Sequence, residues 1–166
     1  MGTQQQLLLV VTIIIIAIAI TVGINSFNHY SKINNRNAII ADLNTIAGHA
    51  LGFYRAPKSM GGGEQHWIPL DDEGNVDKSR GDALGSWINL PGYSDSVDGD
   101  KFHTQNGVFW MNLESWSSDE LIIIGSGLEK GDDSSYSSSG HGEAGCVEVE
   151  LRVVGSTQSF QLTILN

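Results

Sequence analysis

The chain has 166 residues, with 19 acidic and 9 basic side chains and a formal net charge of −10. This acidic balance disfavours direct binding to nucleic acid, whose phosphates attract basic surfaces. A single cysteine, Cys146, excludes an intramolecular disulfide, so packing alone must stabilise the fold.

The first predicted element is a strongly apolar helix. Residues 7–24 carry no charge, and at 1.5 Å per residue they span about 27 Å, close to the hydrocarbon thickness of a bilayer. We assign residues 1–25 as a transmembrane or filament-core helix and residues 26–166 as a globular head. The predicted assembly residues in this helix are Met1, Gln4, Gln5, Gln6, Leu7, Leu8, Val11, Ile14, Ile15, Ile18, Val22 and Ile24.

Two ordinary alternatives apply to this segment. A cleaved signal peptide fits poorly, because residues 1–6 contain no Lys or Arg and residues 25–27 do not form a cleavage site of the A-x-A type. A single-span anchor fits the length. Since Lys32 and Arg36 both follow the span, the positive-inside rule would then place the head in the cytoplasm. A surface location therefore requires a basic leader before Met1 or another device that sets the orientation.

The helix is predicted to continue to about residue 55. No proline interrupts residues 25–54, and apolar side chains recur at helical spacing along one side. This stripe consists of Ile33, Ile39, Ile40, Leu43, Ile46, Ala47, Ala50, Leu51 and Tyr54. A helix over about residues 4–55 would be roughly 78 Å long. It should end before Pro57 and the three glycines at 61–63.

The uncharged start, the Leu/Ile/Val/Ala run and the continuation NAIIADLNTIAGHALGFYR (residues 37–55) resemble type IV pilins and the pseudopilins of type II secretion. The resemblance covers about a third of the chain. It implies a basic leader cut after a glycine, methylation, and a mature helix that passes from the inner membrane into a filament core.

Two registers are open under this resemblance. Cleavage after Gly2 would make Thr3 the first mature residue; alternatively, Met1 is already the mature terminus. In the second register the family's early glutamate falls at Gln5, an amide that accepts a hydrogen bond but cannot neutralise a charge. The family's helix-kinking proline is also missing, and Gly23 is the only helix breaker nearby. The resemblance implies that the family's glutamate pairs with the N-terminal amine of a neighbouring subunit during assembly. We expect Gln4, Gln5 and Gln6 to supply amide oxygens in place of that ion pair.

The head is predicted to be β-rich. Residues 56–106 should form an irregular connection with one short strand at 87–90. Strands are predicted at 107–113, 121–124, 147–154 and 159–165, separated by a flexible Gly/Ser loop at 125–145 that is a candidate for O-linked sugar. The fold class is therefore α+β and pilin-like, with the long N-terminal helix packed on a C-terminal antiparallel sheet of about four strands. The predicted helix–head contacts are Ile40, Leu43, Ala47 and Leu51 against Phe160, Leu162 and Ile164.

No catalytic, cofactor or metal site is expected. The sequence contains no nucleophile elbow, phosphate loop or dinucleotide fingerprint. The acid-rich turns lack the spacing of a calcium loop and are interpreted as solvated acids; they contain Asp71, Asp72, Asp77, Asp95, Asp98 and Asp100. His141, Glu143 and Cys146 lack a fourth zinc ligand, and Cys146 is interpreted as a core residue. The four tryptophans favour packing over a sugar-binding platform.

These observations favour a structural subunit of a type IV pilus-like extracellular filament at the cell surface. Its expected partners are other copies of itself, the inner membrane before assembly, and pilus assembly or secretion machinery. One alternative is a membrane-anchored pseudopilin or minor component of a type II secretion or DNA-uptake machine. Another is a single-span protein whose head binds a ligand.

Overall fold

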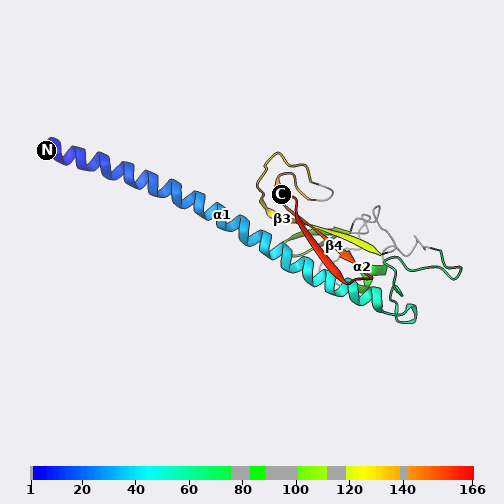
Figure 1. The fold of residues 1–166 in the computed structure, drawn as a ribbon. Helices are drawn as coiled ribbons and strands as arrows, with labels where there is room; N and C mark the ends of the chain where they lie inside the picture. The colour runs from blue at the N-terminus through cyan, green and yellow to red at the C-terminus, as the bar shows by residue number, and fades with distance from the viewer. Residues whose placement is uncertain (1, 76–82, 89–100, 112–118, 139–141) are drawn as a thin grey trace. The chain divides into compact units, whose positions relative to one another are not determined.

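A computed structural model describes residues 2–75, 83–88, 101–111, 119–138 and 142–166 (Figure 1). The chain divides into two compact units, Met1–Asn34 and Asn35–Asn166. The described part of the first unit is almost entirely helix. The second contains the rest of that helix and a β-sheet. This arrangement confirms the α+β layout.

The long helix α1 extends from Thr3 to Arg55, which confirms the predicted element and its bounds to within one residue. Every residue from 2 to 30 is exposed, whereas most residues of the stripe between 39 and 54 are buried. The helix therefore changes its surface chemistry along its length, as the sequence predicts.

The end of α1 is closed by the chain that follows it. The backbone amides of Gly63 and Gln65 donate to the carbonyls of Phe53 (2.8 Å) and Tyr54 (2.7 Å), which lie in the last turn, where a helix leaves carbonyls without their usual donors four residues on. A Cβ atom on Gly63 would lie 1.9 Å from the carbonyl oxygen of His66. Glycine is therefore required at position 63 for a steric reason, because only a residue without a side chain lets the backbone return here.

The sheet has five antiparallel strands in the order β1-β2-β3-β4-β5. They are β1 (Lys101–His103), β2 (Gly107–Met111), β3 (Glu120–Lys130), β4 (Cys146–Val154) and β5 (Ser159–Ile164). A strand is present at each of the four predicted places; residues 112 and 113 of the first prediction lie outside the described part of the chain, and β5 ends one residue before its predicted end.

The connection before the sheet is more regular than predicted. Besides strand β1, it contains a 3-10 turn, η1 (Lys58–Met60), and a short helix, α2 (Ala83–Ile88). The strand predicted at 87–90 is wrong for its first two residues, because Trp87 and Ile88 end α2. Residues 89 and 90 lie outside the described part of the chain.

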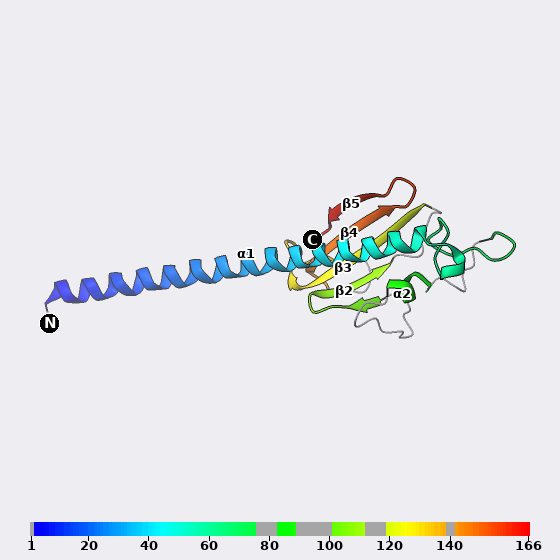
Figure 2. The ribbon, with the colours of Figure 1, turned by 90° about the horizontal axis from the view of Figure 1, so that it is seen from below.

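The core of the head lies between the second part of α1 and one face of the sheet. In Figure 2 the cyan stretch of α1 crosses β3 and β4, with β2 and α2 on one side and β5 on the other. Leu43 and Ala47 are fully buried in this core, and Ile40 and Leu51 pack at its margin. The main partners from the sheet are Phe109, Met111, Leu121, Ile123, Val147, Val149, Leu151 and Val153.

The predicted flexible loop at 125–145 is wrong in its first part, because β3 continues to Lys130. The glycines that suggested a loop lie under α1 instead. A Cβ on Gly125 would come within 2.9 Å of Cγ2 of Ile39, and one on Gly127 within 2.0 Å of Oδ1 of Asn35. These glycines let the helix approach the strand closely.

The packing role predicted for Phe160, Leu162 and Ile164 is also wrong. Their side chains are 48%, 37% and 49% exposed, and α1 packs on β4 instead. The alternation of apolar and polar residues correctly places the three on one face of β5. It carries no information on whether the strand is central or at an edge, and β5 is an edge.

Candidate functional site

The predicted assembly residues, except Met1, which lies outside the described residues, all belong to the exposed first part of α1. The mean hydropathy reaches 3.2 over an 18-residue window, and none of that window is buried. Within the described chain, α1 is the one helix long and apolar enough to cross a membrane. A membrane anchor and a signal sequence both satisfy this criterion.

Two threonines interrupt the apolar run without leaving free polar groups. The hydroxyl of Thr12 donates to the carbonyl of Leu8 (2.8 Å), and that of Thr21 donates to the carbonyl of Ala17 (2.9 Å). Hydroxyls that bond within their own helix can enter apolar surroundings at little cost. The sequence analysis did not use this feature, although a threonine inside a helix is the signal for it.

The first turn of α1 has polar side chains but no carboxylate. Gln4, Gln5 and Gln6 are exposed, and the backbone amide of Gln5 donates to the carbonyl of Gly2 (3.0 Å). Helix N-termini carry a partial positive charge that acidic residues normally complement. Here the side chains of this turn offer only uncharged oxygens, the hydroxyl of Thr3 and the carboxamides of the three glutamines.

In the head, two polar side chains of α1 fix the helix to the sheet. Oδ1 of Asn35 accepts from the amide of Leu128 (3.1 Å), and its Nδ2 donates to the carbonyl of Asn106 (3.0 Å). Oδ2 of Asp42 accepts from the hydroxyl of Thr104 and from Nδ2 of Asn106, both at 2.9 Å. These bonds set the position of the helix along the β1–β2 turn and β3.

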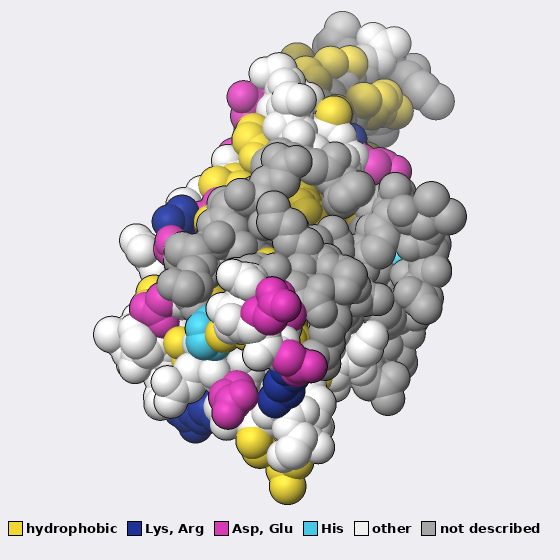
Figure 3. Space-filling model, turned by 90° about the vertical axis from the view of Figure 1, so that its right-hand side faces the viewer, with side chains coloured by type: hydrophobic (Ala, Val, Ile, Leu, Met, Phe, Trp, Pro, Cys, Tyr) yellow, Lys and Arg dark blue, Asp and Glu magenta, His cyan; other side chains and the backbone are white. Residues whose placement is uncertain are grey.

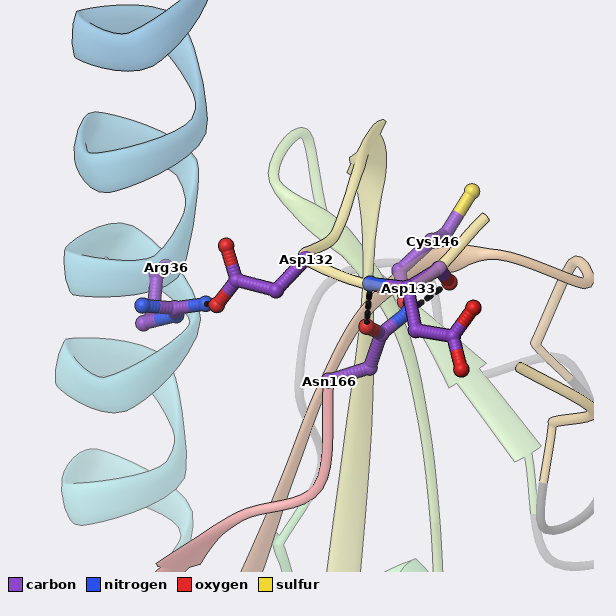
Figure 4. A network of polar contacts seen from close by, with 5 residues as sticks. All are labelled: Arg36, Asp132, Asp133, Cys146 and Asn166. Carbon is purple, nitrogen blue, oxygen red and sulfur yellow. Dashed lines mark hydrogen bonds and ion pairs between the residues drawn. The ribbon is translucent and has the colours of Figure 1, made fainter. Parts of the chain in front are cut away.

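A second polar network connects α1 to the segment after β3 (Figure 4). Nη2 of Arg36 lies 2.7 Å from Oδ2 of Asp132. The side chain of Asn166 accepts from the amide of Asp133 (2.7 Å) and donates to the carbonyls of Asp133 (3.0 Å) and Cys146 (2.8 Å). Asp132 is 68% exposed, so solvent screens its ion pair. The Asn166 bonds are more sheltered and hold the two ends of this segment together.

The Ser-rich segment is also attached to the outer face of the sheet. Glu148 is 1% exposed, and its carboxylate accepts from the hydroxyls of Tyr136 (3.1 Å) and Ser138 (2.8 Å). Side chains alternate between the faces of a strand, so Glu148 points away from the core that holds Val147 and Val149. Tyr136 and Ser138, both within the segment predicted to be a flexible loop, are therefore bonded to the sheet.

Asp119 joins the end of α1 to the β4–β5 turn. Its carboxylate accepts from the hydroxyl and the amide of Ser156, the latter at 2.6 Å, and from the hydroxyl of Tyr54 at 3.2 Å. The bonds from Ser156 hold the pKa of Asp119 below its usual value. Burial, and then the bond to Asp119, raise the pKa of Tyr54.

The residues weighed as metal ligands do not converge in the described part of the chain, where no group of three His, Cys, Asp or Glu side chains is placed to hold a metal ion. Asp71 accepts from the amides of Glu73 (2.9 Å) and Asn75 (2.8 Å), as expected of a turn acid. Four of the other weighed acids and the histidine lie outside the described residues; these are Asp77, Asp95, Asp98, Asp100 and His141.

A hollow of about 230 Å³ lies on the loop that follows α1. Lys58, His66 and Asp72 are among its lining residues, and Nζ of Lys58 lies 2.9 Å from Oδ1 of Asp72. Figure 3 shows acidic, basic and histidine side chains mingled on the described part of the face that it draws. The hollow is smaller than typical small-molecule sites, and its lining carries charges of both signs.

The described tryptophans are used in packing. Trp67 is buried, with its ring centroid 4.6 Å from that of Tyr54. Trp87 packs edge-on against Phe53 at 6.0 Å, and Trp110 is 4% exposed on the outer face of the sheet. The fourth tryptophan, at 116, lies outside the described residues.

No protein-family model matches the chain, and no curated protein or solved structure matches it either. The residues and their geometry therefore carry the functional argument.

Proposed function

We propose that this protein is the structural subunit of a type IV pilus-like extracellular filament and that it polymerises through the apolar first part of α1. The observation that carries the proposal is the two-part chemistry of one unbroken helix. Residues 7–24 are apolar on all sides and exposed, whereas residues 39–54 bury one side against an antiparallel sheet.

The apolar segment needs surroundings other than water. An exposed helical surface of this size is strongly unfavourable in water, and both a bilayer and a bundle of similar helices would remove it. The internal bonds of Thr12 and Thr21 suit either medium. The same segment can therefore serve in a membrane pool before assembly and in a filament afterwards.

The continuation of the helix favours a filament subunit over a plain anchor. Spanning a bilayer needs only about 20 residues, after which an anchor commonly gives way to a linker. In this chain the helix has 53 residues, and its second part supplies one layer of the core of the head. That layout is expected of a subunit which uses one helix both to assemble and to fold.

The test is electron microscopy of the material sheared from cells that produce the full chain. We expect filaments that contain this protein, with a central bundle of helices. Protein found only as monomers in membranes would support the anchor instead. The intact mass of the sheared protein provides the control for processing, because loss of residues 7–24 would identify them as a signal sequence.

A further inference from the structure

Strand β5 has an apolar side that the described residues of its own head cover only in part. Phe160, Leu162 and Ile164 point to one face and remain 37–49% exposed, while Gln161 and Thr163 alternate with them. The strand contains no charge, no proline and no break in its register with β4. Natural proteins usually protect exposed edge strands with charged side chains, prolines or β-bulges. We call the three apolar side chains the β5 strip.

The β5 strip is a direct continuation of the core. Its residues pair with Val153, Leu151 and Val149 of β4, and cross-strand partners share a face of the sheet. The three valine and leucine partners are at most 1% exposed beneath α1. The apolar face therefore extends one strand beyond the edge of its helical cover.

The uncovered strip is one strand wide, so a single helix is wide enough to cover it. A helix is about 10 Å across and neighbouring strands are about 4.8 Å apart, so one helix covers about two strands. Figure 2 shows α2 on the β2 side of α1 and β5 on the opposite side. An apolar face of a sheet is normally completed by a second layer on that face, rather than by another strand at its edge.

The chain itself contains a matching occupant. Residues 7–24 form an uncharged helical segment whose large apolar side chains are 47–70% exposed. Among the described residues, no other stretch of helix combines this length with exposure on all sides. Resting on the function proposed above, we propose that the β5 strip binds the apolar segment, residues 7–24, of a second copy, which lies beside the α1 of the head that it contacts.

Cross-linking between two differently marked copies tests this contact. One copy carries Leu162→Cys and the other a cysteine at one of residues 13–16, all isoleucines in one helical turn. Co-produced in filaments, they should give a covalent dimer whose yield depends on the helix position, since only one side of a helix faces its partner. Each copy alone, Thr163→Cys on the opposite face, and the unchanged chain with its buried Cys146 provide the controls.

Substitution gives a second measurement. Leu162→Gln should reduce the filament yield by about tenfold, the effect of losing one buried leucine contact at the interface. Its matched control is Leu128→Gln, at a side chain 67% exposed at the far end of β3, which should leave the yield unchanged. The thermal midpoint of each variant's head, measured on detergent-solubilised full chain, separates lost assembly from lost folding.

The outcomes distinguish this contact from the proposed function. Normal filaments from Leu162→Gln, or equal cross-linking from all four helix positions, would overturn the β5 contact while leaving the filament intact. Dimers from Leu162→Cys alone would show that two β5 strands meet, which also overturns it. Absence of filaments from the unchanged chain would instead reject the proposed function.

Discussion

Leu43 lies at the centre of the contact between α1 and the sheet, and it is fully buried. Leu43→Ala should lower the free energy of unfolding of the head by about 2–5 kcal/mol, because it removes buried methyl groups and leaves a cavity. Leu128→Ala makes the same chemical change at an exposed position and should cost less than about 0.5 kcal/mol. Denaturant unfolding followed by tryptophan fluorescence measures both. Similar losses would show that α1 does not form the core.

Asp119 makes the stability of the head depend on pH in a defined direction. Its pKa in the folded state lies below the ordinary value of 3.8, because Ser156 donates to the carboxylate. A group of this kind stabilises the fold above its unfolded-state pKa and loses that contribution as the pH falls through the folded-state value.

Asp119→Asn should therefore lower the thermal midpoint at neutral pH. The difference from the unchanged chain should shrink once the pH drops below about 3.8. Thermal unfolding of both proteins over this pH range is the measurement. A difference in thermal midpoint that stays constant down to about pH 2 would mean that the charge of the carboxylate does not strengthen its hydrogen bonds with Ser156.

At the level of elements, the glycines of β3 determine how closely the helix lies on the sheet. Gly125→Ala should destabilise the head by about 1–3 kcal/mol, because its Cβ would press on Ile39 and Phe109. Gly48→Ala provides the matched control on the exposed side of α1, where a Cβ meets nothing within 4 Å. It should stabilise the helix by up to about 1 kcal/mol. Equal effects of the two substitutions would contradict the close contact.

The sequence predicts the elements that follow from local periodicity. Helix α1 is predicted because an apolar stripe continues along it and no proline occurs before Pro57. Strands β4 and β5 are predicted because apolar and polar residues alternate. The extension of β3 is not readable, since Gly125 and Gly127 have the composition of a loop. Their use as a strand depends on helical residues, Ile39 and Asn35, that lie more than 80 residues earlier in the chain.

The polar contacts of the head were missed for a related reason. Asn35, Arg36 and Asp42 lie on one segment of α1, and their partners are between 62 and 96 residues away. A hydrogen bond between distant residues leaves no pattern in either local sequence. Only the register of the helix on the sheet brings such pairs together, and side-chain packing determines that register.

At the scale of the whole chain, the three glutamines separate filament assembly from membrane insertion. Changing Gln4, Gln5 and Gln6 to Leu lengthens the apolar run and should leave insertion intact. The filament yield should fall, because the buried N-terminal amine of a neighbouring copy would lose the amide oxygens that accept its hydrogen bonds. Changing the same three residues to Asn keeps the amide oxygens and should retain filaments. The measurement compares membrane-retained with sheared protein. Normal filaments from the Leu variant would mean that another feature sets the register.

The buried thiol of Cys146 can report how often its part of the head opens. It is the only cysteine in the chain, and it is 2% exposed at the start of β4. A thiol reagent can reach it only when that part of the head opens, so the labelling rate reports the opening frequency without any added probe. Labelling of membrane-retained and sheared protein under the same conditions would give two rates. The ratio of the two rates would show how much the local opening of the head differs between membrane-retained and sheared protein.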